Sequence, residues 1–103
     1  MTASAQTDFD KITAWTADQF GVRQARIYSR TLSVAIQHMT GGPQQLGVRT
    51  RPDIGVNLLT LHVARNKRRG RHLLLMGHEP GSPVITVLRI LHDGMDLPAR
   101  LLD

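Results

Sequence analysis

The sequence predicts an α+β fold in which an N-terminal helical hairpin packs on a three- to four-stranded antiparallel sheet. Apolar residues recur at helical spacing through the first 39 residues and form short, strand-like blocks from residue 58 onward. The segments between these blocks are too short for the crossover connections that parallel strands need. The apolar stripe of the hairpin needs a partner surface, and one face of the sheet supplies it. We therefore expect one domain over residues 1–103.

The first helix is predicted over residues 4–20. Ser4 can cap its amino end, and the carboxylates of Asp8 and Asp10 favour that positive end of the helix. Gly21 is a natural stop.

A second helix is predicted over residues 22–39, ending before Gly41-Gly42-Pro43. Because about one residue separates the two helices, they have to fold back as an antiparallel hairpin. Trp15 and Tyr28 are interpreted as packing residues of this hairpin.

Residues 43–57 show neither the helical spacing nor the strand alternation of apolar residues, and they are predicted to form a connecting loop. Three strands are predicted over residues 58–65, 72–78 and 84–91, with turns between them at 66–70 and 79–83. In the first strand the apolar side chains Leu59, Leu61 and Val63 share one face. The third strand is rich in Val, Ile and Leu, as a central strand would be.

The net charge of +5 is concentrated in one turn. Its positive side chains are Arg65, Lys67, Arg68, Arg69 and Arg71, and elsewhere acidic and basic residues balance. Such a cluster attracts nucleic acid, anionic lipid or an acidic protein segment. It can equally be a solvated turn that keeps the hairpin soluble and discourages edge pairing.

The composition excludes several classes of protein. Without cysteine there is no disulfide framework, no Cys-ligated metal site and no thiol catalysis. Apolar runs stay shorter than the roughly 18 residues of a membrane helix, and the amino terminus lacks the pattern of a secretory signal. We therefore expect a soluble cytoplasmic protein that does not bind membranes.

Metal and catalytic motifs are weak. A metal site would have to combine His62, His72 and His92 from neighbouring strands without any standard ligand spacing, so we expect no metal and no cofactor. RNA cleavage would need cations and a proton-transfer group. The candidates are Arg49, Arg51, Arg65, Arg71 and Arg89, with His92 beside Asp93. From residue 58 onward, histidine supplies the only rings on which bases could stack.

The most informative stretch is Val87-Leu-Arg-Ile-Leu-His-Asp-Gly-Met-Asp-Leu-Pro98. It resembles the carboxyl-terminal block of ParE toxins, in the RelE/ParE superfamily of bacterial type II toxin–antitoxin systems. The residues that match this block position by position are Arg89, Ile90, Leu91, His92, Met95 and Asp96. The amino-terminal half is similar to the family's helical hairpin at Ala5, Asp8, Phe9, Ile12, Phe20, Gly21, Gln24, Ala25 and Tyr28.

Two features depart from the family pattern. ParE proteins usually open with a short strand, whereas this chain begins almost at the helix cap. Either that strand is missing and a sheet edge is exposed, or the true start codon lies upstream. In addition, Leu73 to Met76 replace a strand that is commonly aromatic in relatives.

The resemblance implies a toxin that inhibits DNA gyrase by protein–protein contact and is neutralised by a ParD-like antitoxin with an acidic C-terminal segment. The chain would then not be an enzyme, and nucleic acid would be contacted only through the antitoxin or the target. The expected binding residues are Arg65, Lys67, Arg68, Arg69, Arg71, Arg89, His92, Met95 and Asp96. Residues 92–100 are expected to engage the target, although His92 and Asp96 can instead be structural.

Two alternatives stay open. One is a RelE-like ribosome-dependent mRNA endoribonuclease that uses the Arg cluster and His92. RelE-type enzymes rely on a Tyr-containing cleft, and here no tyrosine follows Tyr28, which favours the non-ribonuclease branch. The other alternative is a plain nucleic-acid-binding module, whose affinity would fall log-linearly with salt.

Overall fold

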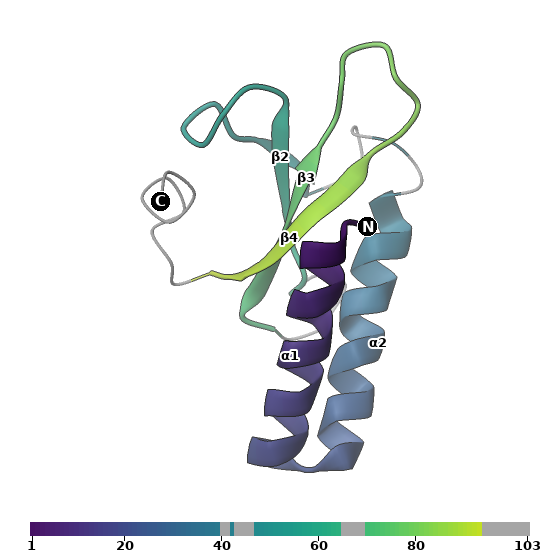
Figure 1. Cartoon of the computed structure of the whole chain (residues 1–103), viewed down its shortest axis with the longest axis vertical. Helices are drawn as coiled ribbons and strands as arrows, with labels where there is room; N and C mark the ends of the chain where they lie inside the picture. The colour runs from purple at the N-terminus through teal and green to yellow at the C-terminus, as the bar shows by residue number, and fades with distance from the viewer. Residues whose placement is uncertain (40–41, 43–46, 65–69, 94–103) are drawn as a thin grey trace.

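The described part of the chain folds into two helices and a four-stranded antiparallel sheet (Figure 1), which confirms the predicted α+β class. The structure is a computed structural model and describes residues 1–39, 42, 47–64 and 70–93. The elements are α1 (Ala3–Phe20), α2 (Val22–His38), β1 (Arg49–Thr50), β2 (Leu58–His62), β3 (His72–Gly77) and β4 (Thr86–His92).

Helix α1 begins one residue earlier than predicted and has a different cap. The hydroxyl of Thr2 accepts a hydrogen bond from the backbone N–H of Ala5 at 3.1 Å, so Thr2 is the N-cap and the prediction of Ser4 was wrong. Asp8 and Asp10 lie beyond the first turn, which contains no acidic residue. The helix-dipole role expected for these two carboxylates is therefore absent.

The turn between the helices depends on Gly21, whose φ of 93° suits a residue without a Cβ atom. Its N–H donates to the carbonyl of Ala17 at 2.9 Å, and its own carbonyl accepts from Ala25 at 3.1 Å. One glycine thus ends α1 and starts α2, as predicted.

The sheet is a meander with the strand order β1-β2-β3-β4. Strand β1 lies within the predicted loop and corrects that prediction: Arg49 pairs with Thr60, and Thr50 with Leu59. A two-residue strand is too short to produce a detectable alternation of side chains. Strand β4 lies at an edge of this order, although its apolar composition predicted a central strand.

The main core lies between the helices and one face of the sheet. Leu59, Leu61 and Val63 face it as predicted, packed against helix residues such as Leu32 and Ala35. On the opposite face a smaller cluster forms around Leu73, Leu75 and Leu91, with Ile54 and Leu58 against it. Because both faces of β3 are buried, this strand is a continuous apolar run.

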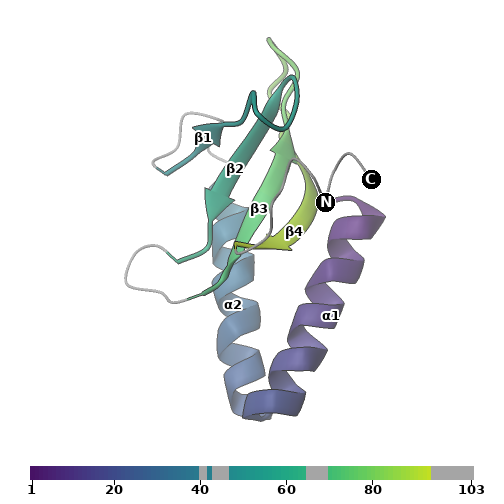
Figure 2. The same cartoon turned by 90° about the vertical axis from the view of Figure 1, so that its left-hand side faces the viewer.

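The start of α1 occupies the outer edge of β4. The backbone N–H of Thr2 donates to the carbonyl of Val87 at 2.9 Å, and its hydroxyl donates to that of Leu88 at 2.7 Å. One carboxylate oxygen of Asp8 accepts from the N–H of Ile90 at 3.0 Å. The amino terminus accordingly lies beside β4 in both views (Figures 1 and 2). The sheet edge that would be exposed if a first strand is missing is thus partly paired.

The far end of the helical hairpin extends past the sheet (Figure 2). Here Trp15 and Phe20 are 56% and 64% exposed, with their rings edge to face at 5.9 Å. Among the described residues, neither helix is long and apolar enough to cross a membrane.

Candidate functional site

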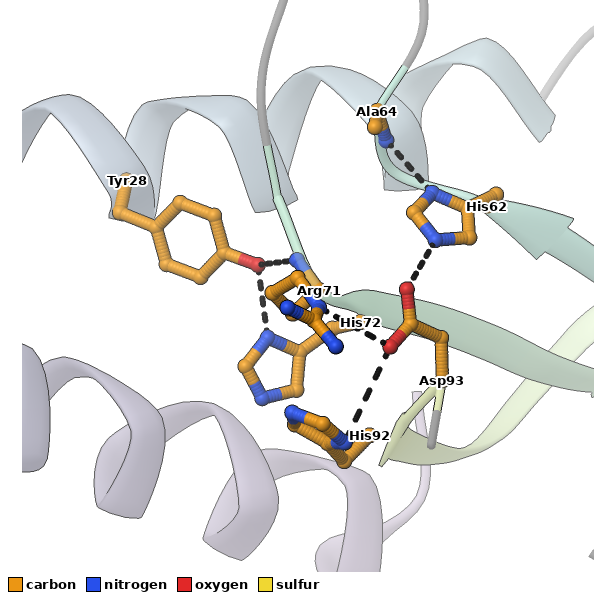
Figure 3. Close-up of polar contacts among 7 residues, drawn as sticks. All are labelled: Tyr28, His62, Ala64, Arg71, His72, His92 and Asp93. Atoms are coloured by element: carbon orange, nitrogen blue, oxygen red, sulfur yellow. Dashed lines mark hydrogen bonds and ion pairs between the residues drawn. The ribbon is translucent and has the colours of Figure 1, made fainter. Parts of the chain in front are cut away.

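Three histidines converge at the end of the sheet that faces the helical hairpin. The antiparallel register of β3 and β4 places His72 opposite His92, and His62 at the end of β2 pairs with Leu73. Asp93 follows β4 directly and lies among them (Figure 3). Sheet pairing thus gathers residues that are far apart in the sequence, and we name His62, Arg71, His72, His92 and Asp93, together with Tyr28, the histidine cluster.

Asp93 is the charge centre of this cluster. Its Oδ2 lies 2.8 Å from His62 Nε2, and its Oδ1 lies 3.3 Å from Arg71 Nε and 3.8 Å from His92 Nδ1. The hydrogen bond from His62 is the largest cause that lowers the pKa of Asp93, and Arg71 adds to it. The carboxylate therefore stays ionised.

The tautomer of His62 follows from its two hydrogen bonds. The backbone N–H of Ala64 donates to His62 Nδ1 at 3.0 Å, so Nδ1 is an acceptor without a proton. The ring proton is then on Nε2 and is donated to Asp93. His62 thus holds the carboxylate in place through its Nε2–H.

Tyr28 reaches the cluster from α2. Its hydroxyl oxygen accepts the backbone N–H of Arg71 at 3.2 Å and lies 2.6 Å from His72 Nδ1. Burial is the main cause that raises the pKa of Tyr28, and burial is also the main cause that lowers the pKa of His72, with the nearby His92 adding to it. Both groups are therefore neutral near pH 7: Tyr28 donates to Nδ1, and Nε2 of His72 keeps the ring proton.

The cluster borders a groove between the helices and the sheet. Its wider part, about 880 Å³, is lined by residues that include Trp15, Thr16 and Phe20 of α1 and Ile27, Tyr28 and Thr31 of α2. Its narrower part, about 330 Å³, is lined by Lys11, Ile12, Trp15, Arg71, His72 and His92. Because both parts share Trp15, Arg71 and His72, we treat them as one site, the hairpin groove.

A further hollow of about 760 Å³ lies beside the segment that precedes β2. Of its described lining residues, only Arg51 and His78 are titratable. In the part of the chain that the structure describes, no group of three or more His, Cys, Asp or Glu could hold a metal ion. The hairpin groove therefore has the richer chemistry of the two.

The structure brings together some of the residues expected to bind partners. Arg71 and His92 meet at the hairpin groove. Arg89 is not among the residues that line it, because its Nε and Nη2 donate to Asp8 at 2.7 and 3.1 Å. The remaining expected binding residues lie outside the described residues: Arg65, Lys67, Arg68, Arg69, Met95 and Asp96.

Sequence reasoning missed the contribution of the helices to this site. Trp15 was expected to pack in the hairpin, but its indole is more than half exposed and lines the groove. Lys11 and Trp15, four residues apart, lie on the same face of α1, and this spacing is a local signal that could have paired them. Tyr28 carried no such signal, because its partners come from β3 after a separation of more than 40 residues.

A helical hairpin packed on an antiparallel meander, with an open groove at the end of the sheet that ionisable side chains line, defines a small α+β protein. The family model for the ParE toxin of the type II toxin–antitoxin system parDE matches residues 1–97. The chain therefore belongs to the ParE toxin family, as the carboxyl-terminal block predicted. A search among curated proteins finds no match.

Proposed function

We propose that this chain is the toxin of a bacterial type II toxin–antitoxin pair and inhibits DNA gyrase in the cytoplasm by protein–protein contact, without chemistry of its own. Membership of the ParE family supports the toxin class. The hairpin groove supports the contact mechanism, because it is open, largely apolar and bordered by exposed Trp15, Phe20 and Ile27. Exposed apolar patches rimmed by polar groups are typical of protein interaction sites.

The neutralising partner in this proposal is a ParD-like antitoxin with an acidic, amphipathic C-terminal segment. The apolar face of such a segment would fill the hairpin groove, and its carboxylates would lie near Arg71, whose side chain is 74% exposed. Arg71, the carboxyl-terminal member of the basic turn, is itself one of the residues that line the groove. Opposite charge speeds the association of such partners and fixes their orientation.

The alternative is a RelE-like endoribonuclease, which the pairing of His72 with His92 beside Arg71 favours. Their rings lie edge to face with centroids 5.6 Å apart, near enough to serve one substrate as proton donor and acceptor. The two functions differ in target: gyrase for the first, and translated mRNA for the second.

The experiment measures gyrase supercoiling and mRNA cleavage in a translating extract with the same purified chain. We expect inhibition of supercoiling and intact mRNA. Intact gyrase activity together with codon-dependent cuts would overturn the proposal in favour of the ribonuclease.

A pair of variants tests the groove itself. Ile27→Glu places a charge in the groove at a side chain that is 50% exposed, and Val84→Glu makes the same change at a 63% exposed site in the loop before β4. We expect Ile27→Glu to weaken gyrase inhibition at least tenfold and Val84→Glu to leave it unchanged. Equal effects of the two variants would remove the groove from the mechanism.

A further inference from the structure

The narrow part of the hairpin groove has the size and the polar groups of a small-molecule site. Its volume of about 330 Å³ lies within the roughly 300–1,000 Å³ that is typical of ligand pockets. Its lining combines an aliphatic side chain and an indole with two cations and two imidazoles. Figure 3 shows the polar side of this hollow, where His72 and His92 lie next to each other below Arg71.

The two cations come from separate elements, and neither is fully neutralised by ion pairs with the described residues. Lys11 of α1 has no ion-pair partner among the described residues, and Arg71 contacts Asp93 through Nε, on one edge of its guanidinium. No carboxylate is among the described residues that line the hollow. Asp8, on the same helix as Lys11, is engaged by Arg89 and by the N–H of Ile90, and Asp93 is engaged by His62 as well as Arg71. The hollow therefore favours an anion.

The imidazoles add hydrogen-bonding groups beside these two cations. Because Nδ1 of His72 is hydrogen-bonded to Tyr28, the donor that the ring still offers is Nε2–H, and His72 is one of the residues that line the hollow. His92 lies at the mouth with 45% of its side chain exposed. A phosphate group, with several acceptor oxygens, matches a Lys, an Arg and an imidazole N–H more fully than a single carboxylate does.

The third component is an aromatic surface. Trp15 is the only tryptophan of the chain, is 56% exposed and lines both parts of the groove. Bases stack on exposed aromatic rings, with roughly 1–3 kcal/mol per base by alanine substitution. The sheet supplies only histidine rings, but the fold brings this indole from α1 to the end of the sheet.

We propose that the narrow part of the hairpin groove binds a nucleotide, with the phosphate between Lys11 and Arg71 and the base against Trp15. This site goes beyond the proposed inhibition of gyrase and does not depend on it. A free nucleotide and the exposed end of a single strand share this chemistry. A glutamate-rich peptide without apolar side chains would satisfy the cations but would gain nothing from the indole.

The single tryptophan makes the test direct, because its fluorescence reports on the site alone. The chain is titrated with AMP, adenosine, inorganic phosphate, the dinucleotide ApA and a glutamate-rich peptide. We expect saturable quenching by AMP or ApA, and at least tenfold weaker binding of adenosine and of phosphate. Tighter binding of AMP than of ApA identifies a free nucleotide as the ligand, and the reverse order identifies a strand end.

Charge variants locate the phosphate. Lys11→Gln and Arg71→Gln should each weaken AMP binding at least tenfold, whereas Arg26→Gln, on the exposed face of α2 outside the groove, should leave it unchanged. Lys11→Gln removes no described ion pair, so the fold is preserved in at least that variant, and circular dichroism checks this. The proposal is overturned by unsaturable quenching with both nucleotides, by equal losses in all three variants, or by a peptide that binds as tightly as AMP.

Discussion

Gly70 lies where the backbone passes closest to the Tyr28 ring. A Cβ atom at this position would lie 2.6 Å from Val63 Cγ2 and 2.7 Å from the Tyr28 hydroxyl oxygen, distances that force a shift of the core or of the ring. We expect Gly70→Ala to lower the free energy of unfolding by about 1–3 kcal/mol, the usual cost of overpacking. Urea denaturation of the variant and the natural chain measures this loss in the free energy of unfolding.

The matched control for this substitution is Gly77→Ala. A Cβ atom there would meet only the side chain of Leu88, at 3.4 Å. A loss as large in Gly77→Ala as in Gly70→Ala would show that the close approach to Tyr28 is not the cause.

His72 makes the stability of the protein depend on pH. Its pKa is lowered in the folded state by burial first and then by His92, so below about pH 6.5 the unfolded chain binds a proton that the folded chain resists. Stability therefore falls as the pH drops below about 6.5. The groups that face His72 are Tyr28, His62, His92 and Asp93.

Urea midpoints at pH 8, 7, 6 and 5 check this prediction. We expect the urea concentration at the midpoint to decrease in the natural chain as the pH is lowered below about 6.5. It should decrease less in His72→Gln, which has no titratable ring at this position. The same decline in both proteins would assign the pH dependence to other histidines.

At the scale of elements, α1 is fastened to β4 through Asp8. Its carboxylate accepts two hydrogen bonds from Arg89 and one from the backbone of Ile90, and only 14% of its side chain is exposed. Asp8→Ala leaves that N–H and the guanidinium without this acceptor. We expect a loss of about 1–2 kcal/mol in the free energy of unfolding, because hydrogen bonds to charged groups are strong but Arg89 is 43% exposed and screened by water.

Denaturation of Asp10→Ala is the control for this prediction. Asp10 is exposed, and among the described residues it accepts a hydrogen bond from Gln6 alone, so its removal should cost a few tenths of a kcal/mol at most. A double-mutant cycle that combines Asp8→Ala with Arg89→Ala then isolates the interaction energy of the Asp8–Arg89 pair. It also tests the binding role expected for Arg89, since a role in binding would reduce antitoxin affinity in Arg89→Ala beyond the effect of Asp8→Ala.

Most elements could be predicted because their signals are local. The helical hairpin follows from periodicity and from Gly21, and β2, β3 and β4 follow from apolar blocks. In contrast, β1 exists only because Arg49 and Thr50 pair with β2. Two residues are too few to form a sequence pattern that predicts such a pairing. The cap at Thr2 and the ion pair of Asp8 depend on β4, more than 80 residues away.

The site was predictable only on its sheet side. Arg71 and His92 were expected from the basic turn and the carboxyl-terminal block, and the structure places both at the groove. Lys11, Trp15 and Tyr28 come from the helices, and their arrival at the end of the sheet depends on how the hairpin packs. Tertiary packing of this kind leaves no mark in local composition.

At the scale of the whole molecule, the position of charge matters more than its sum. Replacing Lys67, Arg68 and Arg69 by Ser removes three charges from the basic turn. Replacing Arg23, Arg26 and Arg30 by Ser removes three from the exposed face of α2, outside the hairpin groove. We expect only the first change to weaken antitoxin binding and to flatten its dependence on salt, because screened attraction acts within about 10 Å at 0.1 M salt.

Calorimetric titration at several salt concentrations measures both variants against the product of the reading frame next to this gene. Unchanged binding of the turn variant across salt, or equal effects of both variants, would contradict a docking role for the basic turn.

The hydrogen bonds of Thr2 to β4 also constrain the order of events during synthesis. The ribosome makes α1 first and β4 last, and the contact from Thr2 to Leu88 spans 86 positions. A nascent chain that stops before residue 86 lacks β4, which is both the second partner of β3 and the strand that anchors α1. Contacts of such long range form late in folding. The sheet can therefore be completed, and α1 anchored, only after β4 has been translated, so that chains terminated before β4 are released without a finished sheet.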